Sequence, residues 1–171
     1  MKQSIFAGLL IVITMSCNSD KQKKVEPINE KKSEMTVSNK EKAIAVLASL
    51  ETGDQNAINY INPNKYIQHN LAVGDGLAGF GEVMKHAPEG GFKSNIIRAY
   101  EDGDYVFTHT IYDFFGPKIG FDVFRFEDGL IVEHWDNLIP VQPANPSGHT
   151  QTDGATEVTD LDKYTQAEVD S

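Results

Sequence analysis

The sequence has a single cysteine and few basic residues. Cys17 is the only cysteine in 171 residues, so no disulfide can form within the chain. The 15 lysine and arginine residues are outnumbered by 25 aspartate and glutamate residues, which gives a formal net charge of -10. Surfaces that bind nucleic acid or anionic lipid need clustered basic side chains to neutralise phosphates. This composition argues against nucleic-acid binding and favours small molecules or protein partners.

The sequence also lacks an apolar run long enough for a comfortable membrane span. The run from Ile5 to Ile13 is nearly all apolar and follows Lys2, a pattern typical of an export signal. A thiol directly after such a run, here Cys17, resembles the lipobox of bacterial lipoproteins, in which the thiol is acylated. We therefore expect a signal peptide over residues 1–16, lipidation of Cys17 and a location on a bacterial envelope through the lipid anchor alone. An ordinary cleaved secretory signal is the alternative.

The segments on either side of the central region are poor in core-forming residues. Residues 17–37 are polar and rich in Lys and Glu, which is typical of a disordered tether. Residues 143–171 contain prolines, glycines and many acidic side chains, so we expect a tail that lies along the domain at first and then frays. Residues 38–142 are long enough for one domain with a real hydrophobic core.

Helical patterns open this domain. Ser38 and Glu41 have the spacing of a capping box, in which each side chain accepts a hydrogen bond from the backbone of the other. Apolar residues follow at helical spacing, and Gly and Pro residues separate the segments. We expect helices over residues 39–51, 55–61 and 77–86, with a short extended segment at 65–71.

Four β-rich runs with short connections come next and predict an antiparallel meander, over residues 92–100, 104–113, 118–126 and 130–139. Helices followed by such a sheet predict an α+β fold in which the helices cover one sheet face and a pocket opens between them.

The hairpin loops predict which polar side chains meet. A three-residue loop at 127–129 pairs Phe126 with Leu130 and places Asp122 opposite His134. A four-residue loop at 114–117 places His109 opposite Asp122. The two histidines and Asp122 would then form a row across three strands, although a slip of one residue would send a member to the other face. Such a mixture of apolar and ionisable groups suits a pocket for a polar substrate better than a dry core.

Three segments in this order resemble the SnoaL-like branch of the nuclear transport factor 2-like superfamily. They are Tyr-Ile-Gln-His-Asn at 66–70, an Asp-Gly before a helix with Phe80, and 121–136, which ends in Glu-His-Trp-Asp. The similarity covers roughly residues 39–139. It implies a cone of helices wrapped by a strongly curved sheet, often dimeric through the outer sheet surface. In polyketide cyclases of that branch, an aspartate in the final strands is acid and base for an intramolecular aldol condensation without metal or cofactor.

The residue that matches this aspartate is Asp136. A carboxylate on an apolar strand beside histidine can both take and give a proton. His134 and His109 could polarise a carbonyl or relay a proton, or could instead form a hydrogen-bonded pair bridged by Asp122. The residues expected to bind substrate are His69, Asn70, Asp122 and Tyr66, with pinning of the extended segment as the alternative for His69.

Several histidines and aspartates also permit a metal site, but no pair has the spacing of a known metal motif, so we expect neither metal nor cofactor. Two functions stay open. The first is an exported enzyme that uses acid/base chemistry to enolise, condense or isomerise a small carbonyl compound. The second is a non-catalytic module that holds a small ligand at the envelope, and a structural homodimer with a vestigial pocket is a further possibility.

Overall fold

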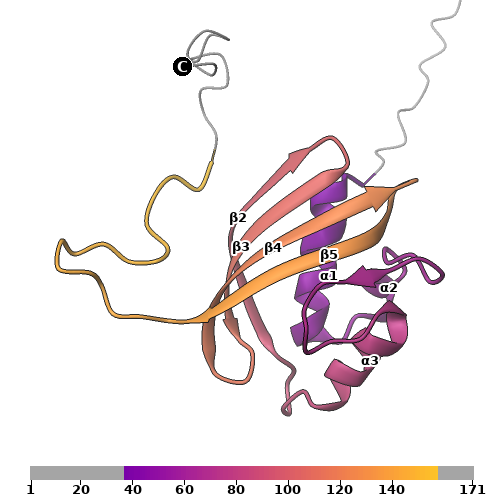
Figure 1. The fold of residues 1–171 in the computed structure, drawn as a ribbon, viewed down its shortest axis with the longest axis horizontal. Helices are drawn as coiled ribbons and strands as arrows, with labels where there is room; N and C mark the ends of the chain where they lie inside the picture. The colour runs from indigo at the N-terminus through magenta and orange to yellow at the C-terminus, as the bar shows by residue number, and fades with distance from the viewer. Residues whose placement is uncertain (1–36, 158–171) are drawn as a thin grey trace, which may run out of the picture. The chain divides into compact units, whose positions relative to one another are not determined.

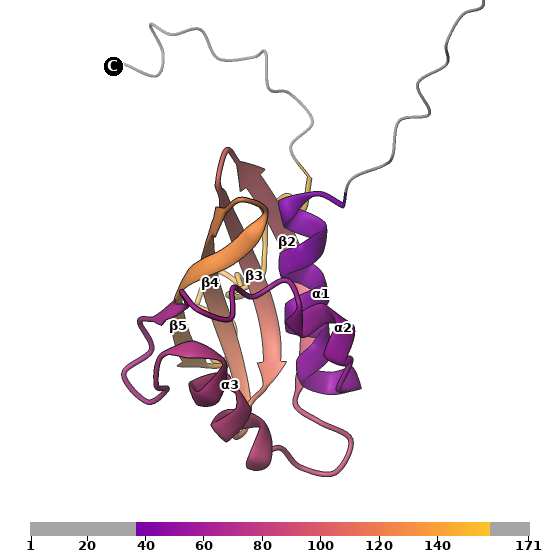
Figure 2. The same cartoon turned by 90° about the vertical axis from the view of Figure 1, so that its right-hand side faces the viewer.

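The structure, a computed structural model, describes residues 37–157 and places the helices on one side of a curved sheet (Figures 1 and 2). The expected signal peptide, Cys17 and nearly all of the expected tether lie outside these residues, as does the end of the acidic tail. Among residues 37–157, no helix combines the length and the apolar character needed to cross a membrane. The elements are α1 (Asn39–Thr52), α2 (Gln55–Ile58), β1 (Ile67–Gln68), α3 (Gly76–Lys85), β2 (Lys93–Asp102), β3 (Tyr105–Asp113), β4 (Pro117–Glu127) and β5 (Leu130–Pro140).

Helix α1 begins at the capping box that the sequence predicts. The Ser38 hydroxyl accepts a hydrogen bond from the Glu41 backbone N–H at 3.1 Å, and the Glu41 carboxylate accepts one from the Ser38 N–H at 2.7 Å. The helix ends at Gly53, whose φ of 68° lies in the left-handed region that glycine adopts without strain. Its buried face joins inward side chains of the sheet in one core, which includes Ala43, Val46, Leu47, Val106, Tyr112, Phe124, Phe126 and Ile131.

The sheet has the strand order β1-β5-β4-β3-β2, in which the last four strands form the predicted antiparallel meander. The short strand β1 adds to the edge of β5 in parallel, with Ile67 opposite Glu133 and Gln68 opposite His134. Helix α2 is shorter than predicted, because Ile61 forms a bridge to Ile131 instead of continuing the helix. The extended segment therefore lies beside the strand that carries His134.

The predicted register of β4 and β5 is wrong by two residues. Their connection has only two loop residues, Asp128 and Gly129, both with positive φ (51° and 75°), as a tight primed turn requires. A bulge at Val132 then adds a second residue of slip. Two slips of one residue preserve the faces, since side chains alternate. Asp122 consequently pairs with Asp136 rather than with His134, but all three stay on one face.

The predicted register of β3 and β4 is wrong by one residue, and here the face changes. Pro117 opens β4 opposite Asp113, a position that proline tolerates at the start of a strand, so the loop has three residues instead of four. Asp122 therefore pairs with Thr108. His109 pairs with Phe121 and lies on the outer face, so the expected row of His109, Asp122 and His134 does not form.

Candidate functional site

A pocket lies between the helices and the inner face of the sheet. Its cavity volume of about 70 Å³ is several times what one water molecule needs. Apolar side chains from α1 and α3 form one wall, and polar groups from the segment around β1 and from β3, β4 and β5 converge on the other. This combination is typical of small-molecule sites. The lining residues used below are Tyr66, Gln68, Asn70, Tyr112, Asp122, His134 and Asp136.

Asp122 is the most enclosed acid of the pocket, with 3% of its surface exposed. One carboxylate oxygen accepts hydrogen bonds from Tyr112 at 2.8 Å and from Thr108 at 3.1 Å. The other oxygen lies 3.3 Å from Nε2 of His134. A buried carboxylate needs such partners, because an unpaired charge in an apolar interior is costly. Asp122 is therefore part of the pocket wall, and its hydrogen bonds orient the neighbouring side chains.

Gly120 makes the hydrogen bond from Tyr112 possible. A Cβ atom at this position would lie 2.3 Å from Cε2 of Tyr112 and 2.8 Å from Cδ2 of Leu138, so any side chain would collide with the aromatic ring. Burial, followed by the negative charge of Asp122, raises the pKa of Tyr112 well above its ordinary value. The phenol stays protonated, and its O–H donates a hydrogen bond to the Asp122 carboxylate.

Asp136 lies directly opposite Asp122 and is only partly buried. The Asn70 side-chain amide nitrogen lies 2.9 Å and 2.8 Å from its two carboxylate oxygens. Asn70 lines the pocket, but its amide nitrogen is engaged by Asp136 and its oxygen accepts from the backbone N–H of Ala72 at 2.9 Å. Asn70 thus orients the acid.

Tyr66 supplies a hydrogen-bond donor beside this acid. Burial, and then the charges of Asp136 and Asp122, raise the pKa of its hydroxyl, so the hydroxyl stays protonated at neutral pH. Its oxygen accepts a hydrogen bond from Gln68 at 3.3 Å. Within residues 37–157 the hydrogen bonds include none in which the Tyr66 hydroxyl donates, so its proton is available to a ligand.

Asp122, His134 and Asp136 could also approach a metal ion, because one ligand atom from each lies within 4.8 Å of the others. Two carboxylates and an imidazole are acceptable ligands for several divalent ions. In this arrangement, however, Nε2 of His134 is directed to Asp122 and the Asp136 carboxylate is held by Asn70. An ion bound through Nε2 of His134 would have to displace the contact with Asp122, whereas the Asp136 carboxylate keeps free lone pairs beside the Asn70 amide.

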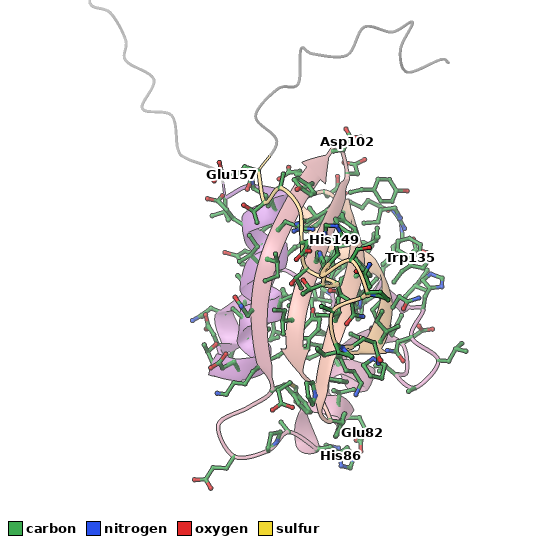
Figure 3. All side chains as sticks on the ribbon, turned by 90° about the vertical axis from the view of Figure 1, so that its left-hand side faces the viewer. Glu82, His86, Asp102, Trp135, His149 and Glu157 are labelled. Carbon is green, nitrogen blue, oxygen red and sulfur yellow. The ribbon has the colours of Figure 1, made fainter. Side chains whose placement is uncertain are left out.

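His109 lies outside the pocket, so its expected place beside Asp136 is wrong. It stacks on Phe121 with ring centroids 4.4 Å apart, and its Nδ1 lies 3.2 Å from a guanidinium nitrogen of Arg98. Arg98 also donates to the backbone oxygen of Thr152 at 2.9 Å, which ties the C-terminal segment to this outer face. Figure 3 looks onto that face, where the segment with His149 crosses in front of the strands.

His69 likewise lies away from the pocket. Its Nε2 is 2.8 Å from a Glu133 carboxylate oxygen, and its ring stacks on Trp135 at 4.7 Å between centroids. Trp135 projects at the edge of the sheet in Figure 3. Arg125 forms an ion pair with Glu133 at 2.7 Å. Side-chain alternation along β5 separates this outer cluster from His134 and Asp136, so His69 holds the extended segment against the sheet, the alternative that its sequence position left open.

Three residues that shape the pocket were not predicted from the sequence: Gln68, Tyr112 and Gly120. Alternation from Tyr66 to Asn70 would have placed Gln68 on the pocket side, since all three share one face of an extended segment. Tyr112 could be found only from the correct register, because the predicted slip sent the even-numbered residues of β3 to the outer face. Gly120 shares the face of Asp122 by alternation, but its contact with an aromatic ring has no signal in the sequence.

No protein-family model matches the chain, and no curated protein does. Solved structures share its fold. A nuclear transport factor 2-like protein of unknown function from Cytophaga hutchinsonii aligns over 63% of this chain and 95% of its own, with 15% identity and a TM-score of 0.53. Another from Burkholderia xenovorans aligns over 68% and 95%, with 18% identity and a TM-score of 0.52. A candidate ketosteroid isomerase from Kribbella flavida aligns over 63% and 82%, with 13% identity and a TM-score of 0.52.

These similarities define the class of fold. The described domain has the α+β fold of nuclear transport factor 2-like proteins, with helices packed on the curved, mainly antiparallel sheet, as the sequence predicted. At sequence identities of 13% to 18%, these similarities support a shared fold and carry no conclusion about a shared activity.

Proposed function

We propose that this chain is a SnoaL-like enzyme that uses Asp136 as general acid and base on a small carbonyl compound. One observation carries the proposal: a partly exposed carboxylate, oriented by Asn70, lines an apolar pocket beside the proton-bearing hydroxyl of Tyr66. Removal of a proton next to a carbonyl requires a positioned base and a donor for the oxygen that becomes negative. Asp136 and Tyr66 supply these two roles.

The proposed reaction begins when Asp136 takes a proton from the carbon next to the carbonyl. The electron pair of the C–H bond moves to the carbonyl oxygen, which accepts a hydrogen bond from Tyr66. In a substrate with a double bond next to that carbon, the conjugated enolate then takes the proton from Asp136 at the far end of the double bond; in a condensation, the enolate attacks a second carbonyl carbon, whose oxygen receives the proton from Asp136. Either course returns Asp136 to the carboxylate form. Because the Tyr66 pKa is raised, this hydroxyl donates a hydrogen bond without giving up its proton.

The alternative function is binding of a small ligand without catalysis. Its supporting observation is that both acids and the imidazole in the pocket already have protein partners, as expected of a rigid binding wall. The protein from Kribbella flavida is similar to this chain in fold only. Its description as a ketosteroid isomerase is an example of chemistry that this fold can hold.

The two functions are separated by Asp136→Asn, which keeps the shape of the side chain and removes the base. The experiment first identifies co-purifying small molecules by mass spectrometry and then measures turnover and binding with them. We expect Asp136→Asn to lose turnover by at least about 100-fold, the usual contribution of a positioned acid or base, and to retain binding. The control is Asp102→Asn at the exposed end of β2. Equal turnover in the three proteins would reject Asp136 as the acid and base, whereas binding without turnover in all three would support the binding function.

We also propose that the protein is exported, anchored through Cys17 and homodimeric. The support for anchoring is the charged start, the short apolar run and the cysteine that follows it. Cys17→Ser should move the protein from the membrane fraction to the soluble fraction of a bacterial host, because a lipid chain supplies the membrane affinity. Unchanged membrane association would contradict lipidation. Sedimentation of the domain over a concentration series tests the dimer.

A further inference from the structure

We propose that Gln68 is a positioning residue that holds the proton of the neutral His134 ring on Nε2. Both ring nitrogens are then occupied by hydrogen bonds to the protein and do not contact substrate. The position of the proton follows from hydrogen bonds alone. Its consequence for catalysis rests on the proposed function, because it leaves Asp136 as the group that both takes and returns the proton.

The orientation of the Gln68 amide is set by the backbone. The N–H of Asn70 donates to Oε1 of Gln68 at 3.0 Å. Because a backbone N–H can only donate, the atom that it meets must be the amide oxygen. The other end of the amide is therefore the NH₂ group, and it points toward the pocket wall.

This NH₂ group determines the tautomer of His134. The Gln68 nitrogen lies 3.0 Å from Nδ1 of His134 and 3.3 Å from the Tyr66 oxygen, so its two hydrogens have one acceptor each. An amide NH₂ offers no lone pair, and Nδ1 must accept as a bare nitrogen. The proton of the neutral ring consequently resides on Nε2, which lies 3.3 Å from the carboxylate of Asp122. The burial of His134, at 8% exposure, keeps water from replacing these partners.

In this arrangement His134 does not relay a proton to or from a ligand, which was one of the roles that the sequence suggested for it. Its one lone pair is taken by Gln68 and its one N–H is directed at Asp122, so neither can serve a ligand without breaking a buried hydrogen bond. The reactions that fit the proposed function are then those in which the Asp136 carboxylate alone acts first as the base and then as the acid. Isomerisation of a carbonyl compound through its enol is such a reaction, and aldol ring closure is another if the new alkoxide receives the same proton.

The experiment is long-range hydrogen–nitrogen NMR of the histidine rings in the full chain at neutral pH. We expect His134 to show one bare Nδ1 and one protonated Nε2. A spectrum with Nδ1 protonated would overturn the proposal. This first measurement uses the unaltered protein and requires no substrate.

The variant Gln68→Glu replaces the NH₂ donor with a carboxylate that can only accept. We expect a proton to appear on Nδ1 of His134, which moves the nitrogen signal from the bare to the protonated range. The matched control is Gln55→Glu, which adds the same charge at an exposed position in α2 and should leave the His134 signals unchanged. If the Nδ1 signal of the folded Gln68→Glu variant stays in the bare range, Gln68 does not set the tautomer.

The NMR results on the His134 tautomer do not depend on whether the protein is an enzyme. Full turnover by Asp136→Asn would reject Asp136 as the base and leave the His134 tautomer in place. A bare Nδ1 that survives Gln68→Glu would reject the role of Gln68 and leave Asp136 as the base.

Discussion

Asp122 and Asp136 are direct partners across β4 and β5, and an oxygen of each lies within 4.8 Å of a ring nitrogen of His134. Their surroundings differ. Asp122 is buried beneath Tyr112, Thr108 and His134, whereas Asp136 is partly exposed and held by a single amide. Two acids of the same type can thus have separate roles, with Asp122 organising the wall and Asp136 available to a ligand.

Gly120→Ala should destabilise the domain by about 1–3 kcal/mol, because the new methyl group collides with the Tyr112 ring in a packed interior. Urea unfolding measures the change. Gly81→Ala is the matched control: a Cβ at Gly81 meets nothing within 4 Å, and alanine is favoured inside helix α3. The control should be neutral or stabilising by up to about 1 kcal/mol. Equal stability of the two variants would contradict the close contact at Gly120.

Tyr112→Phe should cost about 1.5–3 kcal/mol of unfolding free energy, because it removes a donor from a buried carboxylate. Tyr105→Phe serves as the control, since Tyr105 is 49% exposed at the start of β3. A double variant with Thr108→Val measures the coupling between the two donors to the same Asp122 oxygen. Strictly additive losses would show that the donors act separately.

The stability of the domain should fall as the pH is lowered through about 6.5. Burial, followed by the charge of Arg98, lowers the pKa of His109 from its ordinary value of 6.5. Below that value the unfolded chain binds a proton that folded His109 does not, so protonation favours the unfolded state. The loss of stability levels off once the pH falls below the pKa of His109 in the folded protein, because both states then bind the proton.

Comparison of His109→Gln with the original protein by urea unfolding at pH 8 and pH 5.5 isolates this contribution. The variant should lose less stability between the two pH values. His149→Gln, at an exposed position of the C-terminal segment, is the control. Identical pH dependence in His109→Gln and the original protein would exclude His109 as the source.

Arg98→Gln should loosen the C-terminal segment, because the guanidinium donates to the backbone oxygens of Thr152, Asp153 and Gly154. Limited proteolysis within residues 143–157 should become several-fold faster, since cleavage follows local opening. Arg125→Gln is the matched control, because Arg125 pairs with Glu133 on the same face. Equal cleavage rates for both variants would count against the Arg98 contact.

Local features of the sequence predicted most of this fold. The capping box at Ser38, the alternation along the four long strands and the short connections identify the helices and the meander. They also place Asp122, His134 and Asp136 on one face. The register error that changed a face came from one loop, because Pro117 joins β4 and shortens the loop before it by one residue. That slip alone exchanged His109 for Thr108 beside Asp122, since one residue of register reverses the face.

The polar contacts of the pocket could not be read from the chain in the same way. Gln68 meets His134 because β1 pairs in parallel with β5, a contact between residues 66 positions apart that no local pattern encodes. Similarly, the position of His69 on the outer side depends on this pairing and on its stack with Trp135.

Strand β1 is only two residues long, yet the amides that orient both His134 and Asp136 come from it and from the residues that follow it. The four-stranded meander, which holds half of the buried apolar residues that the structure describes, contributes neither amide. Substitutions in this short edge segment can therefore change the hydrogen bonds of the pocket while the residues of the meander stay the same. Selection could thus alter the substrate of such a scaffold while its framework stays the same.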